Sequence, residues 1–299
     1  MTQRLTLPTA LLLTLPPMLW AGNAVVGRLV SPLVPPLTLN FLRWGLAFLL
    51  LLPFAWRLLR PTSPIWPRMG RYAVLGLLGV GCYNALQYMA VRTSTPINVT
   101  LVASSMPFFM LGFGALFFHQ RITGRQVLGA ALSIAGVLVV LCRGDAAHLA
   151  EVRFVPGDLY MLLATAAWSV YSWLLTRPGD PPEVRSDWAG FLMAQLVPGV
   201  AWSALFAAGE TAVTTQQIQW GWPLAAALAY VAMGPALLAY RCWGLGVQRV
   251  GPNIAGFFSN LTPLFAALFS AAFLGEPPRL FHALAFVLIV AGIVVSSRR

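Results

Sequence analysis

The succession of long apolar runs is the feature that most restricts what this chain can fold into. A helix needs about 20 apolar residues to cross a bilayer, and none of the runs alternates with the period of a strand. Short polar or proline-rich breaks separate them, and they occupy residues 6–27, 36–56, 72–91, 97–118, 126–142, 158–176, 188–208, 222–244, 253–274 and 280–296. The sequence therefore predicts an all-α polytopic membrane protein with ten transmembrane helices.

Composition and charge exclude several other classes of protein. Hydrophobic residues make up 59% of the chain and charged residues 9%, whereas soluble domains carry about 25% charged residues. The net charge is +11, and every basic residue is an arginine. No basic run or aromatic-basic motif predicts a nucleic-acid partner. The cysteines, Cys82, Cys142 and Cys242, lie in apolar stretches without paired spacing, so we expect free thiols and no metal cluster.

The arginines predict the orientation in the membrane, because cytoplasmic loops carry an excess of basic residues. If the N-terminus is cytoplasmic, 12 arginines fall in inside segments and 5 in outside loops. Both termini are then expected in the cytoplasm, which requires an even number of helices. The first run contains Pro16-Pro17 and lacks an Ala-x-Ala cleavage site, so it is interpreted as a retained span and not a signal peptide.

An internal repeat divides the chain into residues 1–143 and 156–299. Three matches share one offset, since 252 − 96, 263 − 107 and 291 − 135 all equal 156, and Trp20 matches Trp168 at 148. The pairs at offset 156 are Pro96 with Pro252, Pro107 with Pro263, and Ala135-Gly136 with Ala291-Gly292. Each half holds five predicted helices, an odd number, so the second half must be inverted. Inverted repeats place a site near the bilayer midplane and expose it alternately to each side.

Several motifs together resemble the EamA-type branch of the drug/metabolite transporter superfamily. The motifs are Trp20-Ala21-Gly22-Asn23, Arg43, Pro156-Gly157-Asp158-Leu159, Ala166-Ala167-Trp168-Ser169-Val170-Tyr171 and Leu274-Gly275-Glu276. The chain departs from the pattern at His119-Gln120, where the family often has an acidic end. The resemblance covers essentially the whole chain and implies export of amino acids, aromatic ones included, or related metabolites across a bacterial inner membrane. It implies no cofactor.

Polar and aromatic residues inside the predicted spans are the candidates for a substrate cavity. Such groups cost energy in lipid unless they face protein, water or substrate, and Asn84, Gln87 and Tyr88 share one helical face. The candidates are Trp20, Asn23, Arg43, Tyr83, Asn84, Gln87, Tyr88, Ser104, Trp168, Tyr171, Tyr240, Trp243 and Asn260. For each residue the alternative is hydrogen bonding between helices or anchoring at the interface. Pro107 and Pro263 are candidate hinges.

Arg43 stands apart because it lies seven residues into its span, about 10 Å along a helix. The first 144 residues contain no carboxylate side chain, so a salt bridge is not expected. Three partners remain open: backbone carbonyls freed by prolines, water in an open cavity, or the carboxylate of a passing amino acid. Aromatic walls with a few amides suit a neutral or zwitterionic substrate with an apolar side chain.

What the sequence lacks narrows the function further. No span centre contains Asp or Glu, which disfavours proton-coupled export of cationic drugs, and the three histidines lie at span ends or in a loop. No catalytic constellation or phosphate loop is present, so neither an enzyme nor a nucleotide-driven pump is expected. A passive channel and an exporter of other metabolites or drugs remain the alternatives. We expect a monomer whose partners are its small-molecule substrate and the lipid bilayer.

Overall fold

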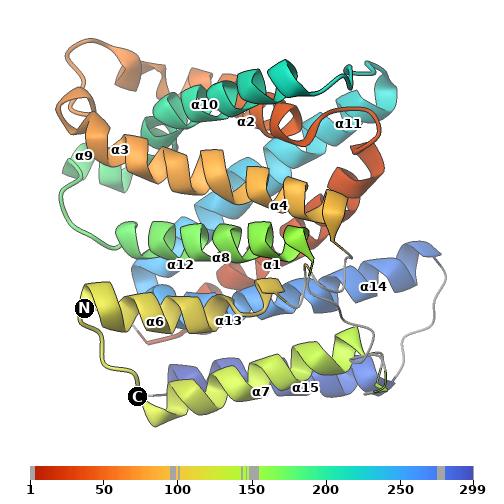
Figure 1. Ribbon diagram of the computed structural model, residues 1–299. Coiled ribbons are helices and arrows are strands. Elements are labelled where there is room, and N and C mark those ends of the chain that lie inside the picture. Colours follow the sequence, from red (N-terminus) through yellow and green to blue (C-terminus); the bar gives the residue numbers. More distant parts are fainter. Residues whose placement is uncertain are drawn as a thin grey trace.

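The structure is a computed structural model that describes residues 4–94, 99, 102–142, 144–145, 147, 155–274 (backbone only for 270–274) and 280–298. Every regular element in these ranges is a helix (Figure 1). Seven of the described helices are long and apolar enough to cross a membrane, among them Leu7–Val30, Trp66–Thr93 and Trp222–Val250. The predicted class, an all-α polytopic membrane protein, is therefore confirmed.

The helices of the first half follow the predicted runs with small shifts at their ends, except that the helix described in the run 97–118 begins only at Met106. They are α1 (Leu7–Val30), α2 (Pro36–Ala55), α3 (Met69–Leu75), α4 (Tyr83–Thr93), α6 (Met106–Phe118) and α7 (Gly124–Leu141). Between α3 and α4 the chain forms a π-helical segment, Gly76–Cys82, so that one long helix runs from Trp66 to Thr93. A capping box begins α7, because Thr123 and Gln126 each accept a hydrogen bond from the other's backbone N–H.

The second half contains α8 (Pro156–Leu174), α9 (Pro182–Ser186), α10 (Trp188–Val213), α11 (Trp222–Val231), α12 (Ala239–Val250), α13 (Pro252–Phe258), α14 (Thr262–Leu274) and α15 (Leu280–Ser297). A second π-helical segment, Ala232–Leu238, joins α11 to α12. Its bounds lie 156 residues after those of the first (232 − 76 and 238 − 82). The same spacing relates the bounds of α6 to α14 and of α7 to α15.

Helices of the two halves pack directly against each other. The main pairs are α7 with α15, α2 with α10, α4 with α8 and α1 with α12 (Figure 1). The α7–α15 pair depends on small residues, since a Cβ added to Gly129 would lie 2.7 Å from the carbonyl oxygen of Gly292. Arg4 and Arg298 line one surface groove, so the described chain begins and ends at the same end of the bundle.

Candidate functional site

An aromatic cluster forms where α1, α4, α8 and α12 meet. At its centre Trp168 is fully buried, with its ring centroid 4.6 Å from that of Tyr83 and 5.1 Å from that of Trp20. The other neighbours of Trp168 are Tyr171 at 4.9 Å, Tyr240 at 5.1 Å and Trp243 at 5.6 Å. The tilted and edge-to-face arrangements are those that aromatic quadrupoles favour. The structure thus brings together six of the seven aromatic candidates of the first, third, sixth and eighth predicted spans.

A polar cluster lies next to these rings and has Arg43 at its centre. The Arg43 side chain is fully buried, and its Nη1 donates to Asn84 Oδ1 at 2.7 Å, to Tyr88 Oη at 3.1 Å and to Asn23 Oδ1 at 3.2 Å. The hydroxyl of Tyr88 donates in turn to Asn23 Oδ1 at 2.9 Å. Three helices, α1, α2 and α4, therefore meet at one guanidinium.

Asn84 connects the polar cluster to the aromatic one. Its Nδ2 donates to Tyr240 Oη at 3.3 Å, and Tyr240 donates to the carbonyl of Gly79 in the first π-helical segment. Asn40 supports the same segment, donating from Nδ2 to Val80 O at 3.0 Å. π-helical turns widen the backbone and leave carbonyls available to side chains. The segment therefore positions acceptors at the junction of the two clusters.

Some polar groups in this region have no hydrogen-bond partner among the described residues. They include Nε and Nη2 of Arg43 and Nε1 of Trp168. Arg43 lies with its Cζ 5.1 Å from the ring centroid of Trp44, and no described carboxylate is paired with it. A buried guanidinium without a counter-ion is costly, so these N–H groups leave an uncompensated charge in the interior. The partners that do occupy Nη1, side-chain amides and a phenol, are not among the three expected from the sequence.

Two residues that the sequence analysis did not select belong to the same region. Gln195 on α10 accepts from Tyr171 Oη at 2.9 Å, and the Trp44 ring lies 4.8 Å from that of Tyr240. Gln195 is 152 residues after Arg43, and α10 begins 152 residues after α2 (188 − 36). A polar residue seven positions into an apolar run, in both halves, is the signal that could have identified Gln195.

The remaining candidates lie outside the aromatic and polar clusters or form other contacts. Gln87 is half-buried and forms no hydrogen bond within the described part of the chain. Ser104 is buried just before α6. Asn260 donates to Ser133 Oγ on α7 at 2.8 Å, which joins two helices instead of completing the cluster. Pro107 and Pro263 lie in the first turns of α6 and α14, where proline is tolerated; Pro96, used in the repeat, falls outside the described residues.

Glu210 shows why an acidic residue near a span end need not be functional. Its carboxylate accepts from the backbone N–H groups of Leu37 and Thr38 at 3.1 and 2.7 Å, and from Thr38 Oγ1 at 2.9 Å. Glu210 therefore stabilises the start of α2, where the helix dipole favours negative charge. Among the described residues, no group of three His, Cys, Asp or Glu side chains could hold a metal ion.

Comparisons with known proteins show what this chain is similar to. The chain is 28% identical to the aromatic amino acid exporter YddG of Ancylobacter novellus, over 94% of this chain and 93% of the relative. It is 26% identical to a probable amino-acid metabolite efflux pump of Salmonella typhimurium, over 93% and 90% of the two chains. A solved crystal structure with 24% identity covers 96% of both chains at a TM-score of 0.71.

The family model of the EamA-like transporters matches residues 7–142 and again residues 155–298. The two matched ranges together cover almost all of the chain, and they contain both the aromatic and the polar cluster. Transport is the activity for which this family is named. The chain is a multi-pass membrane protein that belongs to the EamA-like transporter family of the drug/metabolite transporter superfamily.

Proposed function

We propose that this protein exports amino acids with aromatic or other apolar side chains across the bacterial inner membrane. The observation that carries the proposal is the buried, unpaired part of the Arg43 guanidinium beside the Trp168 cluster. The two groups match the two ends of such a substrate, a carboxylate and an apolar side chain. The similarity to an aromatic amino acid exporter of Ancylobacter and to a probable amino-acid metabolite efflux pump of Salmonella supports the same substrate class.

The chemistry of the proposed site follows from its two clusters. Nε and Nη2 of Arg43 can form the paired hydrogen bonds that a carboxylate accepts, while the indole and phenol rings contact the substrate side chain. The rings also provide cation–π contacts for the α-ammonium group, at about 2 kcal/mol in a desolvated site. The rings lie 4.6 to 6.4 Å apart, so substrate binding requires that they separate.

We infer that the chain works by alternating access. It consists of two inverted five-helix repeats, residues 1–143 and 156–299, which together hold ten transmembrane helices. The 156-residue spacing of both π-helical segments supports this arrangement. So does the pairing of helices, because α1 packs on α12 as α8 packs on α4. Helices that exchange equivalent contacts can rock about a central site.

The proposed topology has both termini in the cytoplasm, in keeping with 12 arginines inside against 5 outside. Single cysteines at Thr62 and Gly179, in a background without the native cysteines, should react with an impermeant thiol reagent only from the cytoplasm. A cysteine at Ala147 should react only from outside. Labelling of position 62 from the periplasm would reverse the assignment.

Proteoliposomes test the proposed activity directly. Radiolabelled L-phenylalanine should enter vesicles that hold unlabelled phenylalanine faster than empty ones, because a carrier exchanges substrate whereas a channel does not. Measurements with and without a pH gradient then identify any proton coupling. Uptake of phenylalanine that never saturates, or that is equal in protein-free vesicles, would contradict the proposal. We also propose that the monomer is sufficient, which reconstitution at one protein per vesicle checks.

A further inference from the structure

A small pocket adjoins the aromatic cluster on the side of the bundle that the arginine distribution assigns to the cytoplasm. It lies between α8, α9, α10 and α12, with Tyr171 and Tyr240 at its inner end and Arg185, Trp188 and Arg241 among its other lining residues. Its volume is only about 40 Å³, compared with the ~300–1,000 Å³ of small-molecule sites. The pocket is therefore closed to an amino acid in this structure.

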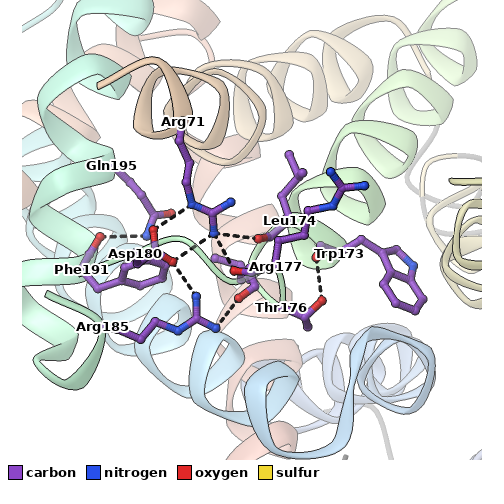
Figure 2. A network of polar contacts seen from close by, with 10 residues as sticks. Arg71, Trp173, Leu174, Thr176, Arg177, Asp180, Arg185, Phe191 and Gln195 are labelled. Carbon is purple, nitrogen blue, oxygen red and sulfur yellow. Dashed lines mark hydrogen bonds and ion pairs between the residues drawn. The ribbon is translucent and has the colours of Figure 1, made fainter. Parts of the chain in front are cut away.

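A buried carboxylate beside this pocket joins three segments of the chain. Asp180, in the segment after α8, accepts from Arg71 Nε of α3 at 2.8 Å and from Arg185 Nη1 of α9 at 2.7 Å (Figure 2). Only 1% of the Asp180 side chain is exposed. We call Arg71, Asp180 and Arg185 the latch. Opening the pocket between α8 and α9 would strain these ion pairs, because one of the arginines also lines it.

Backbone contacts make the latch more rigid. Arg71 Nη2 donates to the carbonyls of Leu174 and Arg177 at 3.1 and 3.0 Å, and Arg185 Nη2 donates to that of Leu175 at 2.6 Å (Figure 2). The carbonyls of Leu174 and Leu175 lie at the end of α8, where a helix dipole favours cations. Burial raises the pKa of Asp180, but hydrogen bonds and charge from both arginines outweigh it, so the pKa lies below its usual value. The latch is thus ionised at neutral pH.

The lining of the pocket is positive. It includes two arginines, Arg185 and Arg241, and no acidic residue. Arg241 is exposed, with its Cζ 4.7 Å from the ring centroid of Trp188, and within the described ranges it forms no ion pair. Gln195 and Gln248 add amide groups along the lining. Guanidinium next to aromatic surface attracts a carboxylate joined to an apolar group.

We propose that this pocket is the cytoplasmic access site for substrates that carry a carboxylate, with Arg241 binding the carboxylate and Asp180 keeping the pocket closed. The inference rests on the proposed function for its orientation and its cargo. It adds a second binding position to Arg43, on the path that a substrate takes before it reaches the aromatic cluster.

Thiol labelling measures whether the latch closes the pocket. Gly244 lines the pocket, and a Cβ there would meet no atom within 4 Å, so Gly244→Cys is tolerated in a background without native cysteines. From the cytoplasmic side, Asp180→Asn should raise the labelling rate of this cysteine about tenfold, the equivalent of 1.4 kcal/mol. Asp180→Glu keeps the charge and should stay slow. Thr62→Cys, in the exposed turn after α2, is the control whose labelling should not change.

A second variant guards against misfolding. Arg71→Gln removes the same link from α3 and should accelerate labelling as Asp180→Asn does, with monodisperse protein in both cases. Unchanged labelling of the Gly244→Cys protein in both variants would overturn the role of the latch.

Protection by a small carboxylate tests the binding position. In the Gly244→Cys, Asp180→Asn protein, benzoate should slow labelling about tenfold more than benzamide, because only benzoate forms a charge-assisted pair. Arg241→Gln should abolish this protection, whereas Arg249→Gln, on the same helix but outside the pocket, should keep it. Equal protection by both compounds, or protection that survives Arg241→Gln, would overturn the access site. Benzoate protection without phenylalanine transport would instead contradict only the proposed function.

Discussion

Replacing Arg43 by glutamine separates the structural role of this residue from a role in substrate binding. Nη1 of Arg43 joins Asn23, Asn84 and Tyr88 through contacts of 2.7 to 3.2 Å, while Nε and Nη2 have no described partner. Arg43→Gln removes both sets of donors and the buried charge. The two roles nevertheless predict different results, because only one of them depends on the chemistry of the ligand.

The magnitudes can be worked from these contacts. A hydrogen bond to a charged group contributes about 1.5–3 kcal/mol and a neutral one about 0.5–1.5 kcal/mol. Losing a charge-assisted pair with the substrate carboxylate should therefore weaken L-phenylalanine binding about 10- to 150-fold, but phenylalaninamide binding at most about tenfold. Stability should change less than three lost hydrogen bonds suggest, because removing the guanidinium also removes its desolvation cost of several kcal/mol.

Competition binding with radiolabelled L-phenylalanine measures both ligands on one purified protein, and thermal unfolding in the same detergent measures stability. Arg43→Lys retains the charge but not the fork of donors, so it should lose less affinity for phenylalanine than Arg43→Gln does. Arg28→Gln, which removes an exposed arginine from α1, controls for net charge. Equal losses for acid and amide, together with a lower melting temperature, would refute a carboxylate contact and leave Arg43 a structural residue.

Three further predictions concern other parts of the fold. Trp168→Ala should destabilise the protein by about 3–5 kcal/mol and weaken phenylalanine binding. Trp56→Ala, at a residue that is 47% exposed, should do neither. Thermal unfolding and phenylalanine binding measure the two effects. Gly129→Ala should lower the melting temperature by about 2–10 °C, because its Cβ meets the Gly292 carbonyl. Gly112→Ala, in open space, should not lower it, because alanine favours a helix over glycine. The pKa of Asp180 is lowered in the folded state, so its contribution is fully present above the unfolded value of about 3.9. The melting temperatures of wild type and Asp180→Asn should then differ by a constant amount from pH 5 to 8 and converge as the pH falls through the folded pKa; a difference that already shrinks at pH 6 would contradict this.

The sequence predicts the helices of this protein well because their signal is local. An apolar run of about 20 residues is sufficient to indicate a spanning helix, and the described helices lie close to the expected ranges. The aromatic cluster could also be predicted from the sequence, since Trp20 and Trp168 occupy corresponding positions in the two halves. Their shared position indicates that both rings face the same interior.

The rest of the site depends on contacts between helices, and one amino-acid sequence does not show which helices touch. Asn260 and Asn84 are both amides inside apolar runs, but Asn260 bonds Ser133 on α7 and Asn84 bonds Arg43. Only the rotation of each helix decides between these outcomes. The π-helical segments add to the difficulty, because a π turn shifts every following residue around the helix axis relative to an α-helical count. Tyr83 and Ala239 directly follow these segments.

The two halves differ in one respect that bears on how a substrate lies in the site. Arg43 and Gln195 occupy the same position in α2 and α10, and each contacts the first helix of its own half: Arg43 binds Asn23 of α1, and Gln195 binds Tyr171 of α8. A second arginine at position 195 would bury two like charges in one interior, which a medium of low dielectric strongly penalises. Two glutamines would leave no charge for a carboxylate. In the proposed function, this single guanidinium binds the substrate carboxylate. The carboxylate then lies toward the first half and the side chain toward Trp168.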